Sequence, residues 1–144
     1  MKRRHPRGGF TTRPCKATRP LAIFRYPGGK TKLLPQISRF LWLKKATTYI
    51  EPFVGGGSVT LAVAQANPNI KIILNDRDSN MHSFWKVVAS GSDNEFETLI
   101  KRVQRTRPTV SLFRRLKKTP GNSTAERAFT ALYTNRTAFG GNAR

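Results

Sequence analysis

The chain has 144 residues, 38% of them hydrophobic, which is enough for one domain with a core of its own. Its 27 Lys and Arg residues against 7 Asp and Glu give a formal net charge of +20, which favours a polyanionic partner, with nucleic acid as the first candidate. A lone Cys15 excludes an intramolecular disulfide, and two isolated histidines argue against a metal site. No apolar run reaches the ~20 residues needed to cross a membrane, so we predict a cytoplasmic protein.

Residues 1–20 form a basic leader with seven Lys or Arg, three prolines, two glycines and no acid. Such a composition cannot bury enough apolar surface to order itself, so we predict a disordered arm. The arm either contacts nucleic acid or is only solvated, and its composition is compatible with both.

Residues 21–91 show the pattern of a βαβ unit. Apolar side chains at helical spacing predict helices, and β-rich or continuous apolar runs predict strands. The predicted elements are a helix over 33–41, a strand over Thr47–Glu51 ended by Pro52, a glycine turn and a helix stopped by Asn67-Pro68, a buried strand over Ile70–Asp76, and a helix with Met81, Phe84, Trp85 and Val88. A βαβ unit implies a doubly wound, mostly parallel sheet with helices on both faces.

Residues 92–144 are predicted to be helical. Ser92 with Glu95 forms a capping box for a helix over Phe96–Arg105, and a second helix is predicted over Val110–Lys117. A second capping box, Ser123 with Glu126, opens a helix whose apolar side chains share one face. These side chains are Ala125, Phe129, Leu132 and Tyr133.

The turn Glu51-Pro-Phe-Val-Gly-Gly-Gly57 lies between a predicted strand and a predicted helix. Its glycines allow backbone N–H groups to approach a ligand at the positive end of the helix, and Asp76, after the next strand, is placed to accept both hydroxyls of a ribose. Thr60 stands where G-x-G-x-x-G has its third glycine, so a ligand with one adenosine and no pyrophosphate fits better than NAD. The alternative is a tight turn followed by an N-capping aspartate.

The stretch Tyr26-Pro-Gly-Gly-Lys-Thr-Lys32 looks like the end of a P-loop, G-x-x-x-x-G-K-[ST]. The first glycine of that motif would fall at Phe24, so the loop would lack the flexible backbone that wraps phosphates. A nucleotide hydrolase built on this stretch is therefore disfavoured.

Several motifs, in the same order along the chain, resemble those of Dam-like (D12 class) DNA adenine N6-methyltransferases. They are Tyr26-Pro-Gly-Gly-Lys30, the cofactor loop Phe53-x-Gly55-x-Gly57, the ribose motif Leu74-Asn-Asp76, and Asn135-Arg-Thr-x-Phe139, which leads into the DNA-recognition region. The resemblance implies a Rossmann-like methyltransferase fold with S-adenosylmethionine as cofactor and double-stranded DNA as substrate. It also implies a bacterial or phage protein of the restriction-modification type.

The resemblance assigns roles to individual residues. Tyr26 and Lys30 would contact the methionine end of the cofactor, Phe53, Gly55 and Gly57 would form the loop at the cofactor, and Asp76 would hold the ribose. On the DNA side the implied contacts are Asn135, Arg136, Phe139 and Arg144, although Gly140 departs from the family's usual asparagine. Asp78 has no family role and is interpreted as a solvated or helix-capping acid.

The family's catalytic loop, Asp-Pro-Pro-Tyr, does not occur in these residues, which contain no Asp-Pro or Pro-Pro pair. The resemblance therefore implies an N-terminal half in three parts: the arm (1–20), a cofactor-binding core (21–91), and a helical segment that begins the DNA-recognition region (92–144). The catalytic loop would lie beyond Arg144 or on a second polypeptide. The alternative is a non-catalytic basic protein, derived from this fold, that only binds nucleic acid. Cofactor binding separates the two hypotheses.

Overall fold

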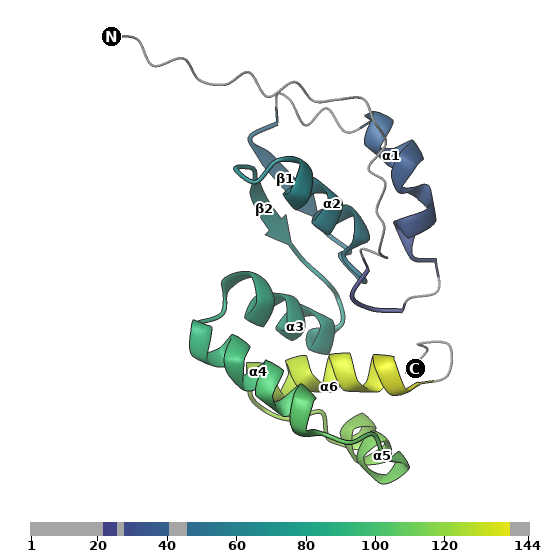
Figure 1. The fold of residues 1–144 in the computed structure, drawn as a ribbon, viewed down its shortest axis with the longest axis vertical. Coiled ribbons are helices and arrows are strands. Elements are labelled where there is room, and N and C mark those ends of the chain that lie inside the picture. The colour runs from purple at the N-terminus through teal and green to yellow at the C-terminus, as the bar shows by residue number, and fades with distance from the viewer. Residues whose placement is uncertain (1–21, 26–27, 41–45, 139–144) are drawn as a thin grey trace.

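The computed structural model describes residues 22–25, 28–40 and 46–138 (Figure 1). In chain order the elements are the 3₁₀ helix η1 (Lys30–Leu33), α1 (Leu34–Phe40), β1 (Thr48–Glu51), α2 (Ser58–Ala66), β2 (Lys71–Leu74), α3 (Ser79–Ser90), α4 (Asp93–Arg105), α5 (Val110–Lys118) and α6 (Thr124–Thr137). The predicted arm, residues 1–20, lies outside the described residues. No helix in the described ranges is long and apolar enough to cross a membrane.

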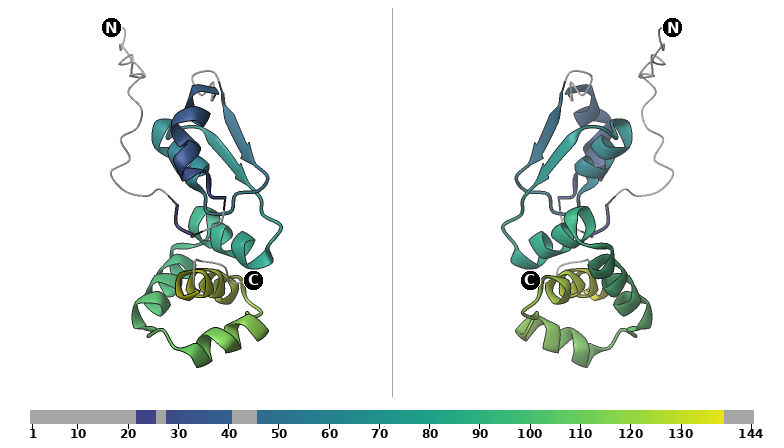
Figure 2. Two further views of the ribbon diagram at one scale, coloured as in Figure 1. Left: turned by 90° about the vertical axis from the view of Figure 1, so that its right-hand side faces the viewer. Right: turned by 90° about the vertical axis from the view of Figure 1, so that its left-hand side faces the viewer.

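The two strands confirm the predicted βαβ unit. β1 and β2 pair in parallel, in a register that runs from Thr48 opposite Lys71 to Glu51 opposite Leu74, and α2 connects them. Helices α1 and α2 lie on the same side of the strands (Figure 2). Tyr49 and Ile72 point to that side, where they pack with the buried residues Val59 and Val63 of α2. One face of the sheet is thus covered.

The opposite face of the sheet corrects one prediction. Ile50 and Ile73 are paired across the strands, and their side chains are 60% and 42% exposed. β2 is therefore not a buried strand within the described ranges, because no helix there covers this face. β2 also ends at Leu74 instead of Asp76, since the Asn75 carbonyl turns to accept a hydrogen bond from the Val54 N–H at 3.0 Å.

Helices α3 to α6 form a second group beyond the ends of the strands (Figures 1 and 2). α6 packs against α3, α4 and α5 around a core that includes Phe84, Leu99, Leu116 and Phe129. Phe24, from the segment before η1, is only 2% exposed and meets the Phe84 ring edge to face at 4.6 Å between centroids. This contact joins the N-terminal segment to the helical group.

Both predicted capping boxes are confirmed, and each one sets where its helix begins. Ser92 and Glu95 open α4, and Ser123 and Glu126 open α6, with the serine and glutamate side chains each bonded to the other's backbone N–H. Because Ser92 is the N-cap, α4 begins at Asp93, three residues earlier than the prediction placed it.

Candidate cofactor site

The turn between β1 and α2 takes a conformation that requires glycine. Gly55 has φ +47° and Gly57, the N-cap of α2, has φ +70°. A β-carbon on Gly57 would also lie 2.2 Å from the Trp85 ring of α3. The turn therefore holds its backbone tightly against α3, and the Trp85 indole N–H donates to the Gly55 carbonyl at 3.0 Å.

The Asp76 carboxylate faces this turn. Its Oδ2 accepts a hydrogen bond from the Gly55 N–H at 2.8 Å, and its Oδ1 accepts one from the Asp78 N–H at 3.0 Å. An ionised carboxylate offers about four acceptor positions, so two lone pairs remain for ligand hydroxyls. Asp76 is partly buried, which orients the group while leaving it accessible. The two remaining acceptor positions thus suit the two hydroxyl donors of a ribose.

Asp76 also lines a pocket of about 400 Å³ between the C-terminal end of β2 and α3. The lining combines apolar and polar side chains in nearly equal number: Val54, Ile72, Leu74, Asn75, Asp76, His82, Trp85, Lys86 and Ala89. Ligand sites typically have volumes of this order. The pocket is large enough for a nucleoside beside the carboxylate.

Asp78 has a separate role, and the helix-capping alternative given for it is confirmed. Its Oδ1 accepts from the N–H groups of Asn80 and Met81, at 2.8 and 3.3 Å, and caps α3. The N-capping function is therefore performed by Asp78, whereas the Asp76 side chain is directed to the glycine turn.

A buried carboxylate that sequence reasoning left without a role supports the same turn. Glu51, 8% exposed, accepts hydrogen bonds from the Thr60 N–H at 3.1 Å and from the Thr60 hydroxyl. Burial, together with the neighbouring Glu51 carboxylate, raises the pKa of the Tyr49 phenol. Thr60, which replaces the third glycine of the dinucleotide motif, thus ties the first turn of α2 to the end of β1.

The N-terminal motif is described in part. Tyr26 lies outside the described residues, Gly28 has φ +80°, and Lys30 begins η1 with an exposed side chain. η1 packs near α2, and the Ile23 N–H donates to the Gly56 carbonyl at 3.2 Å, so the segment before the motif runs beside the glycine turn. Phe53, at 73% exposed, stands on the turn next to Val54 of the pocket.

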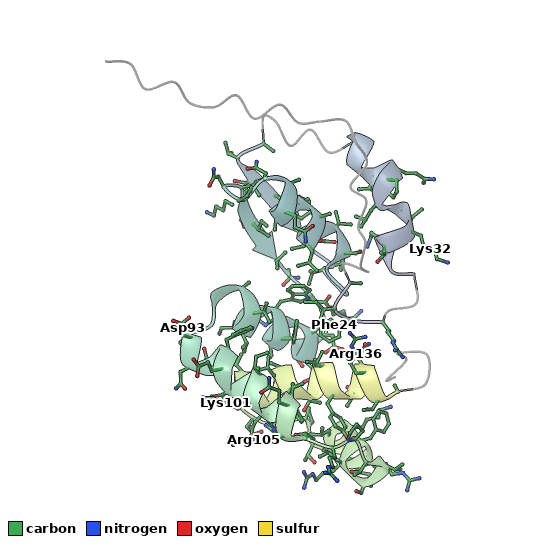
Figure 3. All side chains as sticks on the ribbon, viewed as in Figure 1. Phe24, Lys32, Asp93, Lys101, Arg105 and Arg136 are labelled. Carbon is green, nitrogen blue, oxygen red and sulfur yellow. The ribbon has the colours of Figure 1, made fainter. Side chains whose placement is uncertain are left out.

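The residues predicted to contact DNA are placed in different ways. Asn135 is buried, at 6% exposed, and its side chain bonds to the backbone of Arg25. Arg136 is exposed in the last turn of α6 (Figure 3). Phe139 and Arg144 lie outside the described residues. The DNA contacts of these four residues stay predictions.

A dense basic surface lies on and before α5, and we call it the α5 basic segment. It comprises Arg105, Arg107, Arg114, Arg115, Lys117 and Lys118, all exposed, with no acid between residues 105 and 118. The apolar side of the same helix faces the core through Leu112, Phe113 and Leu116. The packing therefore turns the cations outward, where they can contact phosphates.

A parallel βαβ unit with a glycine turn after the first strand and an acid after the second is the arrangement of a nucleotide-binding α/β protein. The family described as D12 class N6 adenine-specific DNA methyltransferase matches residues 26–144, and the chain belongs to this family.

Three curated proteins are similar to the chain. The type II methyltransferase M.MjaIII of Methanocaldococcus jannaschii is 38% identical over 81 residues, which cover 54% of this chain and 28% of that protein. The DNA N-6-adenine-methyltransferase of Escherichia phage P1 is 41% identical over 68 residues, 46% of this chain and 8% of that protein. The type II methyltransferase M1.LlaDCHI of Lactococcus lactis subsp. cremoris is 27% identical over 121 residues, 81% of this chain and 41% of that protein. The chain thus spans less than half the length of each of these relatives.

Proposed function

We propose that these 144 residues are the S-adenosylmethionine-binding part of a DNA adenine N6-methyltransferase. The observation that carries the proposal is the Asp76 carboxylate, fixed by the Gly55 N–H at the edge of a pocket of about 400 Å³, with lone pairs left over. Family membership supports the cofactor, and the family's description and the name of the relative from phage P1 support DNA as the substrate.

In this account each residue of the site has a physical task. Asp76 would accept hydrogen bonds from the ribose hydroxyls, and Val54, Leu74 and Trp85 would form an apolar wall beside the nucleoside. The turn from Phe53 to Gly57 would lie along the cofactor, and Tyr26 and Lys30 would bind its methionine end. The bound cofactor supplies the methyl group, and the target adenine is flipped out of the duplex to meet it.

Catalysis requires groups that these residues do not contain. No Asp-Pro-Pro-Tyr occurs in the 144 residues, so the group that would hold the flipped adenine comes from further residues of the protein or from a second polypeptide. We therefore propose the full Rossmann-like fold, and methyl transfer, only for the completed protein.

Calorimetric titration with S-adenosylmethionine tests the proposal on three proteins. Asp76→Ala removes the acceptor of the ribose hydroxyls and should weaken binding by ~1–3 kcal/mol. Asp78→Ala is the matched control, because it deletes an acid two residues away and costs ~1 kcal/mol of helix capping without touching the pocket. Equal affinity in the wild type and Asp76→Ala would refute the ribose assignment.

The α5 basic segment favours a second candidate function, nucleic-acid binding without catalysis. Its six exposed cations would contact phosphates whether or not a cofactor binds. DNA binding by the wild type without any binding of S-adenosylmethionine would favour this candidate over the first.

A further inference from the structure

The side chain of Asn135 makes a paired contact with one residue of the N-terminal segment. Its Oδ1 accepts a hydrogen bond from the Arg25 N–H at 2.8 Å, and its Nδ2 donates one to the Arg25 carbonyl at 2.8 Å, across a sequence separation of 110 residues. This exchange of two bonds is what a neighbouring β-strand would offer to the same residue. A carboxamide is suited to it because it carries a donor and an acceptor side by side, whereas a carboxylate has only acceptors.

The segment held in this way is also fixed to the glycine turn. The Ile23 N–H donates to the Gly56 carbonyl at 3.2 Å, and a β-carbon on Gly56 would lie 3.1 Å from the Phe24 carbonyl oxygen. Phe24 is buried against Phe84 of α3. Asn135 of α6 therefore holds the backbone of Arg25, three residues before Gly28 of the Gly-Gly-Lys motif.

We propose that Asn135 is a positioning residue of the cofactor site, which acts through Arg25 to set the course of the chain into Gly28, Gly29 and Lys30. The inference rests on the proposed function, since the motif matters only if the cofactor binds there. Without the Asn135 side chain, the Arg25 N–H and carbonyl lose these hydrogen bonds. The segment before the motif is then held to the rest of the protein by the Ile23–Gly56 hydrogen bond and the packing of Phe24. The Asn135 carboxamide is buried and bonded to Arg25 on both its donor and its acceptor side.

The test uses Asn135→Ala, the milder Asn135→Ser and a matched control, Thr134→Ala. Thr134 is the preceding residue of α6 and is similarly buried, but its hydroxyl donates to the Thr130 carbonyl of the same helix, at 2.7 Å. Asn135→Ser keeps a neutral hydroxyl that can donate or accept but cannot replace both bonds to Arg25, so it covers the case in which Asn135→Ala does not fold.

Two readouts separate a positioning role from a general loss of stability. In amide NMR spectra without ligand, both Asn135 variants should shift the resonances of Gly28, Gly29 and Lys30 and speed hydrogen exchange at Arg25, whereas Thr134→Ala should do neither. In calorimetry, Asn135→Ala should bind S-adenosylmethionine about tenfold more weakly than the wild type. Asn135→Ser should lie between the two, and Thr134→Ala should bind as the wild type does.

The outcomes also distinguish this inference from the proposed function. If the wild type binds S-adenosylmethionine and both Asn135 variants bind it equally well, only the positioning role is overturned. An equal loss of affinity in Thr134→Ala, or unchanged resonances of Gly28, Gly29 and Lys30, overturns it as well. If the wild type binds no S-adenosylmethionine at all, the proposed function fails and the positioning role fails with it.

Discussion

The Trp85 ring of α3 occupies the space in which a side chain on Gly57 would stand. A β-carbon added to Gly57 would fall 2.2 Å from one ring carbon and 2.3 Å from the next, and Gly57 has φ +70°. The same indole donates to the Gly55 carbonyl at 3.0 Å. Trp85 of α3 thus packs directly against the turn. The glycines are needed both for the backbone conformation and because a side chain on Gly57 would clash with the Trp85 ring.

This packing predicts different costs for two glycine substitutions in one turn. Gly55→Ala meets open space at φ +47° and should lower the free energy of unfolding by about 1–2 kcal/mol, the penalty of a left-handed alanine. Gly57→Ala carries the same penalty and must also displace Trp85, so we expect a total of about 2–5 kcal/mol. Urea unfolding measures both, and equal costs would contradict the packing argument.

The α5 basic segment predicts DNA binding with a steep salt dependence and little sequence preference. Each phosphate contact contributes a slope of about −0.9 to log K against log salt, so the double variant Arg114→Gln/Lys117→Gln should reduce the slope by about 2. Lys32→Gln/Lys71→Gln is the matched control, because it removes the same charge from η1 and β2. Binding of specific and scrambled duplexes at several salt concentrations gives both quantities. A control that lowers the slope equally would assign the effect to net charge alone.

The capping box of α6 predicts a defined pH dependence. Hydrogen bonds from the Ser123 and Asn122 backbone hold the pKa of the Glu126 carboxyl below its ordinary value of 4.5. Because the pKa is lowered in the folded state, the contribution is fully present above pH 4.5 and is lost as the pH falls through the lower folded value. Urea unfolding of the wild type and Glu126→Gln from pH 6 downward should show the wild type losing its advantage below about pH 4.5. A constant difference at every pH would contradict the assignment.

Local patterns were sufficient to predict most of the elements. The pairs Ser92 with Glu95 and Ser123 with Glu126 each span only four residues of sequence, and both form the predicted capping box, although α4 begins three residues before the predicted start. The proximity of Asp76 to the glycine turn was also predictable, because the carboxyl ends of neighbouring parallel strands meet at one edge of the sheet.

Contacts between distant segments were beyond such reasoning. Nothing local marks Asn135 as the partner of Arg25, since the two lie 110 residues apart and the pairing depends on how α6 packs. The exposure of Ile73 was missed for a related reason: an apolar run indicates that a strand can be buried but not which elements cover it. The role of Thr60 became clear only with the buried Glu51 beside it.

Separate titrations of the wild-type chain with S-adenosylmethionine, ATP and NAD test whether the Asp76 pocket takes S-adenosylmethionine. We expect binding of S-adenosylmethionine, weakened by ~1–3 kcal/mol in Asp76→Ala, and much weaker or no binding of the other two. The turn departs from the dinucleotide motif at Thr60, and Phe24 replaces the first glycine of a P-loop. Binding of ATP or NAD as tight as that of S-adenosylmethionine, or tighter, would contradict the account.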